Sequence, residues 1–309
     1  MSSGEVVLPI IDLSGYIDPK SPEDKQRVIE EVRDAARQYG FFQAKGHGIP
    51  LDLQQDLLRC MSNVFNLPKD EKLKMSFLEN PCRRGYEAAG MSHREGDALP
   101  DAKECFFVGR EDPEVELSGF YGPNVWPNLP EADFRGPTIW SILLEGLNQP
   151  LDLVEQFAKR PIVPMKLIRY PPHSQAAAGQ FGIGAHTDFG GVTILFQQPG
   201  KDGLEVWHEG REEWIEVPAR EDIYVVNCGD MVQRWSGGAY KSARHRVINK
   251  ADGERLSCAT FWHGDVHATN PLRPDDPNKE TVGLLLAKRF RNQYSFTKEF
   301  LAEVGVGAA

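Results

Sequence analysis

The feature that most constrains the fold is a series of short β-type segments in the second half of the chain. Eight such segments follow one another, at residues 163–170, 192–197, 204–207, 213–217, 223–227, 231–235, 242–248 and 256–262. Turn-forming sequences such as PGKDG (199–203) and SGGAY (236–240) separate them. Closely spaced strands of this kind favour a sandwich or jelly roll over a parallel α/β sheet.

The first half of the chain has the period of helices instead. Ser21 is a typical N-cap, and Pro22 opens a helix whose apolar residues recur on one face until Gly40. A second apolar stripe runs from Leu53 to Phe65, residues 103–110 form a strand-like island, and residues 281–292 restore a helix. We therefore predict a mainly β protein with flanking α: a double-stranded β-helix (jelly roll) with an N-terminal helical layer and a C-terminal helix.

These patterns suggest one structural unit with three parts. We assign residues 1–160 to a helical and loop region packed on the core, 161–268 to the jelly-roll core, and 269–309 to a C-terminal helical segment. A total of 309 residues suffices for one large domain. The helical stretch from 138 to 160 is short and breaks at GLNQP (146–150).

Charge and cysteine content restrict the partners. A net charge of −10 without a dense Lys/Arg run disfavours nucleic acid, and no apolar run approaches the roughly 20 residues that cross a bilayer. Five cysteines without a CxxC pair indicate reduced thiols and hence a cytoplasmic protein. We expect a monomer that acts on small molecules.

Two histidine–aspartate pairs are candidates for a metal site. On a strand, His186 and Asp188 would point the same way about 6.6 Å apart, and both could reach one ion. The pair at His263 and Asp265 lacks a convenient third ligand, because His267 would lie roughly 13 Å from His263 on an extended strand.

The first pair has a better third ligand downstream. His245 lies on another predicted strand, and Arg255 and Ser257 share one face of the next. A guanidinium and a hydroxyl together form a receptor for a carboxylate. Two imidazoles, one carboxylate and such a receptor fit a facial iron(II) site that keeps positions open for an oxoacid and dioxygen.

The same motifs resemble a known family. HTD (186–188), HRV (245–247) and RLS (255–257) are similar to the H-x-D, H and R-x-S signature of iron(II)/2-oxoglutarate-dependent oxygenases, in the branch that includes isopenicillin N synthase, plant hormone oxidases and thymine hydroxylase. The similarity covers most of the chain. Further matching segments occur in order at residues 8–16, 35–50, 84–90, 122–127, 167–172, 202–207 and 227–247.

The resemblance implies a non-haem dioxygenase of secondary metabolism. It assigns Fe(II) to His186, Asp188 and His245, and 2-oxoglutarate to Arg255, Ser257 and Tyr170. Dioxygen would be consumed and succinate and carbon dioxide released, with ascorbate as a candidate reductant. The reaction would hydroxylate, desaturate or cyclise a small-molecule metabolite.

Five residues are candidates for the substrate pocket, by strand parity or by their position in the family. They are Tyr86, Phe106, Phe107, Phe261 and His263. The alternative for each is an ordinary place in the core.

Two other functions stay open at this stage. Ile168 stands two residues before Tyr170, where many relatives carry asparagine, and LIRYP is closer to isopenicillin N synthase, which needs no 2-oxoglutarate. In that case Arg255 and Ser257 would bind a carboxylate of the substrate. A non-catalytic jelly roll with a structural metal is the second alternative, and a fourth protein ligand would mark it.

Overall fold

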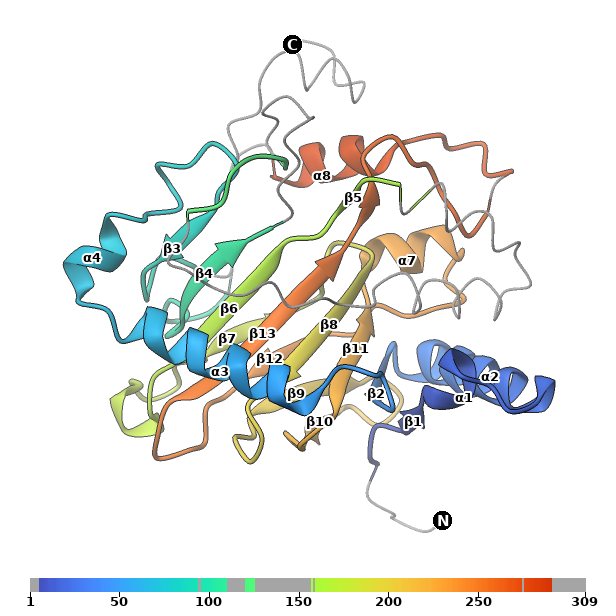
Figure 1. Ribbon diagram of the computed structural model, residues 1–309, viewed down its shortest axis with the longest axis horizontal. Helices are drawn as coiled ribbons and strands as arrows, with labels where there is room; N and C mark the ends of the chain where they lie inside the picture. The colour runs from blue at the N-terminus through green and yellow to red at the C-terminus, as the bar shows by residue number, and fades with distance from the viewer. Residues whose placement is uncertain are drawn as a thin grey trace.

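Two β-sheets face each other in the structure, and helices cover the outer side of the larger one (Figure 1). The computed structural model describes residues 6–93, 96–109, 120–125, 157, 159–273 and 275–290. The eight-stranded sheet has the order β1-β2-β11-β8-β13-β6-β4-β3, and the four-stranded sheet has the order β10-β9-β12-β7. This arrangement is the jelly roll that the strand pattern predicts.

The strand bounds follow the sequence pattern closely. The large sheet contains β1 (Ile10–Asp12), β2 (Phe41–Lys45), β3 (Gly85–Glu87), β4 (Glu104–Val108), β6 (Met165–Tyr170), β8 (Val192–Gln197), β11 (Tyr224–Cys228) and β13 (Arg255–Trp262). The small sheet contains β7 (Ile183–His186), β9 (Leu204–His208), β10 (Glu213–Val217) and β12 (His245–Val247), and β5 (Pro161–Ile162) pairs with β14 (Gly264–Asp265). The helices are α1 (Ser14–Ile17), α2 (Pro22–Gln38), α3 (Leu51–Phe65), α4 (Lys69–Leu73), the 3-10 turn η1 (His173–Gln175), α7 (Asp230–Trp235) and α8 (Val282–Phe290).

One of the eight predicted β segments is wrong. Residues 231–235 belong to the helix α7 rather than to a strand. Met231, Val232 and Trp235 are its buried residues, and they lie on one side of a helix because they are spaced by one and three positions. A short apolar run does not distinguish a buried strand from a buried helix by its period alone.

The N-terminal region forms the predicted helical layer and also extends the large sheet. Ser21 caps α2 by accepting a hydrogen bond from the backbone N–H of Asp24 (3.2 Å), and Gly40 ends the turn after this helix with φ +68°. Strands β1 and β2 lie at one edge of the large sheet, and β3 and β4 lie at the other. The part of the chain before residue 160 therefore supplies both edges of the sheet.

Alternation along the strands gives the large sheet an outer face toward the helices and an inner face toward the small sheet. On β6, Leu167 packs with the helices, whereas Ile168 and Tyr170 pack with residues of the small sheet such as Val206 and Val247. Both faces are buried. The inner face is the one that lies opposite the predicted site strands β7 and β12.

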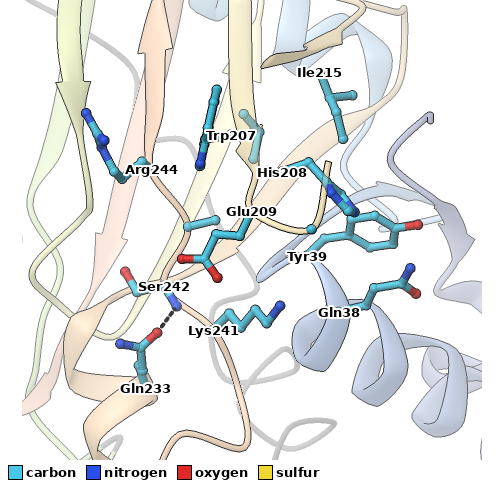
Figure 2. A pocket seen from close by; sticks show the side chains of 13 residues that line it. Gln38, Tyr39, Trp207, His208, Glu209, Ile215, Gln233, Lys241, Ser242 and Arg244 are labelled. Atoms are coloured by element: carbon cyan, nitrogen blue, oxygen red, sulfur yellow. Dashed lines mark hydrogen bonds between the residues drawn. The ribbon is translucent and has the colours of Figure 1, made fainter. Parts of the chain in front are cut away.

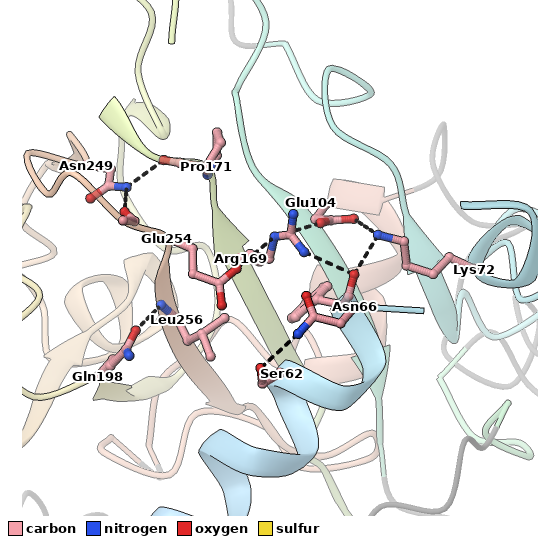
Figure 3. A network of polar contacts seen from close by, with 12 residues as sticks. Ser62, Asn66, Lys72, Glu104, Arg169, Pro171, Gln198, Asn249, Glu254 and Leu256 are labelled. Carbon is pink, nitrogen blue, oxygen red and sulfur yellow. Dashed lines mark hydrogen bonds and ion pairs between the residues drawn. The ribbon is translucent and has the colours of Figure 1, made fainter. Parts of the chain in front are cut away.

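A polar network on the outer face holds the end of α3 against the sheet (Figure 3). Lys72 and Arg169 donate to the last carbonyl of this helix, that of Phe65, at 2.9 and 3.0 Å. Both cations also contact Glu104 on β4, at 2.8 and 3.1 Å, and the hydroxyl of Tyr86 donates to the same carboxylate. Glu104 therefore connects the helical layer to the sheet edge.

Two further expectations concern particular segments. Within the described ranges, no helix is long and apolar enough to span a membrane. The helical stretch expected over 138–160 lies outside the described residues except for residues 157, 159 and 160.

Candidate active site

Strand pairing brings the three predicted metal ligands together. His186 is the last residue of β7, His245 is the first of β12, and the two face each other in the antiparallel register, with ring centroids 4.2 Å apart. Asp188 lies just beyond β7, and its Oδ1 is 3.7 Å from His186 Nε2 and 3.8 Å from His245 Nε2. The pair is therefore split between a strand end and a loop, whereas the sequence argument assumed a continuous strand.

The second ring nitrogen of each histidine lies within hydrogen-bonding distance of a backbone carbonyl. The Nδ1 atoms of His186 and His245 lie 2.9 and 3.2 Å from the carbonyls of Gly184 and Ala243. Each Nδ1 must carry its proton to make this bond, so in the neutral ring Nε2 is the nitrogen that holds the lone pair. The backbone thus selects the tautomer that a metal requires.

Asp188 is held in the same manner. Its Oδ2 accepts hydrogen bonds from Thr193 Oγ1 (2.6 Å) and Asn227 Nδ2 (2.9 Å), which leaves Oδ1 toward the histidines. Burial alone would raise the pKa of this carboxyl, but the neighbouring histidines and these two hydrogen bonds outweigh it and lower the pKa to about 2. Asp188 is thus an ionised ligand at neutral pH.

Sequence reasoning did not find Thr193 and Asn227. The register of β11 with β8 places them opposite each other, so both point from the inner face toward Asp188. The only signal in the sequence was a polar residue at an alternating position in each of two apolar strands. Asn227 lies 39 residues from Asp188 along the chain, so only the strand order shows that the two side chains meet.

The loop that carries Asp188 is fixed by the start of α7. The backbone N–H groups of Asp230 and Met231 donate to the carbonyls of Asp188 (2.7 Å) and Phe189 (3.1 Å). A side chain at Gly190 would collide with the ring of His263, because a Cβ atom there would lie 2.0 Å from Nδ1. This close packing explains the glycine at position 190.

The three side chains fit a divalent metal ion. Two ligand atoms that bind one ion at about 2.0–2.2 Å lie no more than about 4.4 Å apart, and both nitrogen–oxygen distances satisfy this limit. In the described part of the chain, the group contains these three ligands and no fourth. Two histidines and one carboxylate with open positions form the facial arrangement of non-haem iron(II) oxygenases, not a closed structural site.

Arg255, Ser257 and Tyr170 lie together on the inner face. Arg255 pairs with Tyr170 across β13 and β6, its guanidinium lies 4.8 Å from the centre of the tyrosine ring, and both Arg255 and Ser257 are 0% exposed. Burial raises the pKa of Tyr170, although Arg255 and Ser257 beside it act in the opposite direction. The phenol is therefore neutral.

Two polar atoms of this group are buried with hydrogen-bonding capacity that the described residues do not use. Arg255 donates from Nε to the carbonyl of Lys201 (3.0 Å) and from Nη2 to Gln197 Oε1 (2.8 Å), but its Nη1 is buried without an acceptor. Ser257 Oγ is also buried, and the Tyr170 phenol beside it is the one polar side chain of the described residues that it faces at hydrogen-bonding range. A cationic donor and a hydroxyl left open side by side are suited to a carboxylate.

The candidate substrate residues divide between the two faces of the sheet. Phe107 and Phe261 pack on the inner face, and the Phe261 ring lies nearly parallel to that of His263, with centroids 6.1 Å apart. Tyr86 and Phe106 belong to the core under the helices, on the outer face. The expectation that Tyr86 and Phe106 line the pocket is therefore wrong, since the alternation of β3 and β4 turns them away from the metal ligands.

A separate surface pocket opens at the end of α2 (Figure 2). Its wall includes Tyr39, His208 and the residues 241–244 that lead into β12. A volume of about 50 Å³ is far below the several hundred Å³ of typical pockets for cofactors or metabolites. This pocket is therefore not the substrate site.

Comparison with known proteins agrees with this geometry. Residues 8–129 match the family described as the N-terminal part of a non-haem dioxygenase in morphine synthesis, and residues 162–264 match the 2OG-Fe(II) oxygenase superfamily. The chain is 66% identical to 2-oxoglutarate-dependent dioxygenase thnC of Trichoderma harzianum, over 99% of both chains. It is 46% identical to 2-oxoglutarate-dependent dioxygenase caaD of Aspergillus niger, over 96% of both.

Solved structures have the same fold. A full-length protein of Neurospora crassa, solved in complex with alpha-KG, superposes with a TM-score of 0.77 at 24% identity, over 94% of this chain and 98% of that one. At this identity the likeness establishes the jelly-roll architecture. Together with the relatives above, it shows that the chain belongs to the 2OG-Fe(II) oxygenase superfamily, as an enzyme that uses Fe(II), 2-oxoglutarate and dioxygen.

Proposed function

We propose that His186, Asp188 and His245 bind the Fe(II) ion and that Arg255 and Ser257 bind the distal carboxylate of 2-oxoglutarate. The observation that carries this assignment is the environment of Arg255. Its guanidinium is fully buried, and it forms no ion pair with a carboxylate of the described residues. A buried charge without a counter-ion is costly, whereas a carboxylate matches the guanidinium in charge and in bidentate geometry.

Each residue of the site then has a defined task. Bound iron would supply the place where 2-oxoglutarate and dioxygen react to give succinate and carbon dioxide, with the remaining oxygen atom consumed in oxidising the substrate. Thr193 and Asn227 keep Oδ1 of Asp188 turned toward the metal, and the backbone carbonyls of residues 184 and 243 orient the two rings so that their Nε2 atoms face it. Tyr170 packs under the Arg255 guanidinium and restricts its orientation.

The substrate is a small molecule whose C–H bond is hydroxylated, or whose oxidation ends in desaturation or ring closure. Phe107, Phe261 and His263 support this part of the proposal because they share the inner face or pack beside the Asp188 loop. The alternative without 2-oxoglutarate is disfavoured by relatives that are named 2-oxoglutarate-dependent dioxygenases at 66% and 46% identity. Ile168 does not distinguish a reaction with 2-oxoglutarate from one without it, because its side chain packs in the apolar core between the two sheets.

We also infer that the catalytic unit is the jelly roll of residues 161–268, and that residues 1–160 and 269–309 pack on it. We further infer a monomer in the cytoplasm without a nucleic-acid partner, which the net charge of −10 and five cysteines without a CxxC pair support. Light scattering in solution tests the monomer.

The central test is an anaerobic titration of the protein with Fe(II) and 2-oxoglutarate, followed by admission of oxygen. We expect a visible charge-transfer absorption on formation of the ternary complex, and succinate after oxygen is added. His245→Ala should abolish the absorption. A wild-type protein that shows neither the absorption nor succinate would refute the proposal.

A further inference from the structure

Lys166 is a cation on the inner face that none of the roles above uses. It lies on β6, opposite Phe107 of β4 on one side and opposite Ala259 of β13 on the other. Ser257 occupies the preceding inward position of β13, and Phe261 occupies the following one. Inward positions of one strand are about 6.6–6.8 Å apart, so Lys166 lies between the carboxylate receptor and the aromatic residues.

The ammonium group of Lys166 has unused hydrogen-bonding capacity. Its Nζ lies 3.7 Å from Glu87 Oε2 and 4.9 Å from the centre of the Phe107 ring, and it makes no hydrogen bond to a described residue. The side chain is 18% exposed. An ammonium has three donors, so donors remain for a ligand.

The neighbouring Lys103 is satisfied by the protein, in contrast. Its Nζ lies 3.5 Å from both Glu87 and Asp101, it donates to Ser92 Oγ at 3.0 Å, and its side chain is 1% exposed. Ser92 also donates to the other oxygen of Glu87, at 2.5 Å. Glu87 is thus compensated even if the Lys166 ammonium turns to a ligand.

Aromatic side chains lie on both sides of Lys166 along the inner face. Phe107 stacks on Phe77 with ring centroids 5.7 Å apart and presents its inner side to Lys166. Phe261 stacks on His263, which packs against Gly190 beside the metal ligand Asp188. Lys166 therefore lies between Phe107 and the β13 residues Ala259 and Phe261 along the inner face.

We propose that Lys166 determines substrate specificity by binding an acidic oxygen, carboxylic or phenolic, on an aromatic substrate. The ring of the substrate packs on Phe107 and Phe261, and the C–H bond to be oxidised faces the metal side. This inference rests on the proposed function, because it takes Arg255 and Ser257 as the receptor for 2-oxoglutarate. Lys166 then serves a second, separate anion.

The test is calorimetric binding of paired probes to the anaerobic protein loaded with Fe(II) and 2-oxoglutarate. The pairs are 2-naphthoate with its methyl ester, and 2-naphthol with 2-methoxynaphthalene, so that within each pair methylation removes the acidic oxygen and keeps the ring. We expect at least one acidic probe to bind about tenfold or more tightly than its neutral partner, the size of one charge-assisted hydrogen bond. The pair that shows the difference distinguishes a carboxylic from a phenolic substrate.

Lys166→Met should remove this preference, and Lys166→Arg should keep it. Lys250→Met is the matched control, since it removes the same charge from a half-exposed lysine that pairs with Glu205 and Glu216. Thermal unfolding verifies that each variant is folded. Preferences that are equal in wild type and Lys166→Met, or no preference in wild type, would overturn the inference.

The same samples separate this inference from the function on which it rests. The absorption of the iron–2-oxoglutarate complex in the wild-type protein reports on the metal and cosubstrate site alone. If the absorption is absent, the proposed function fails. If Lys166→Met instead weakens 2-oxoglutarate binding about tenfold or more, Lys166 belongs to the cosubstrate site and the specificity role is wrong.

Discussion

Replacement of Arg255 by methionine tests the cosubstrate assignment most directly, because the expected effects with and without 2-oxoglutarate differ. Methionine fills a similar volume but provides no charge and no donor. Without 2-oxoglutarate, the variant loses the hydrogen bonds to Lys201 and Gln197, each worth about 1.5–3 kcal/mol for a charged donor. This loss is offset because the variant no longer buries a guanidinium without an ion-pair partner, which costs the wild-type protein several kcal/mol. We therefore expect the free energy of unfolding without ligand to change by less than about 2 kcal/mol.

With 2-oxoglutarate present, the variant should lack most of the stabilisation that ligand binding gives to the wild-type protein. A carboxylate held by two charge-assisted hydrogen bonds contributes about 3–6 kcal/mol, so the dissociation constant should rise at least about 100-fold. At a ligand concentration of about 100 times the wild-type dissociation constant, binding stabilises the wild-type protein by about 2.7 kcal/mol. The same concentration stabilises the variant by only about 0.4 kcal/mol. At about 2 °C per kcal/mol, the ligand raises the Tm of wild type by about 5 °C and that of the variant by about 1 °C.

The assay is anaerobic thermal unfolding with Fe(II), with and without 2-oxoglutarate. Arg211→Met is the matched control, because it removes an arginine whose side chain is 43% exposed, and it should keep the full ligand-dependent shift. An Arg255→Met protein that is stabilised by 2-oxoglutarate as strongly as wild type would show that the buried guanidinium does not bind this cosubstrate.

Three further perturbations test the supporting structure. Gly190→Ala places a Cβ atom 2.0 Å from the ring of His263, so we expect a loss of about 1–3 kcal/mol in urea unfolding and weaker Fe(II) binding; wild-type values for both would contradict the close packing. Glu104→Gln leaves Lys72 and Arg169 without their shared carboxylate and should cost about 3 kcal/mol, whereas Glu71→Gln at a 53% exposed position should cost less than about 0.5 kcal/mol. Burial would raise the pKa of Glu87, but Lys166 and Lys103 outweigh it and lower the pKa from 4.5 to about 2. Because the folded pKa is below the unfolded one, this carboxylate stabilises the fold above pH 4.5, by about 3 kcal/mol, and the contribution is lost as the pH falls from 4.5 to 2. The difference in unfolding free energy between wild type and Glu87→Gln should therefore shrink between pH 6 and pH 3, and a constant difference would contradict the charge assignment.

Local patterns were sufficient for most of the strands. Seven of the eight β segments in the second half are strands, and the cap at Ser21 starts a helix where the sequence predicts one. The segment at 231–235 was predicted incorrectly because five apolar and polar residues suit either period, and its helical form depends on backbone contacts to the Asp188 loop.

The substrate residues were harder to predict, because a strand shows which residues alternate but not which set faces the site. Phe106 and Phe107 are neighbours in sequence, yet one packs under α3 and the other faces the small sheet. Lys166 was not recognised as a candidate, since a lysine in a strand is ordinarily a solvated residue. Its position between Phe107 and Ala259 depends on strands that are more than fifty residues apart.

The amino-acid sequence by itself determined the period of most segments, the positions of their turns and the residue types of the proposed metal and carboxylate sites, because these depend on chemistry within a few neighbouring residues. The tertiary structure alone decided which polar atoms lose their water without gaining a partner, as at Arg255 Nη1. It also decided which of two adjacent side chains faces the metal ligands. Both outcomes depend on strand order and register, which are fixed only when distant segments bury their apolar faces together.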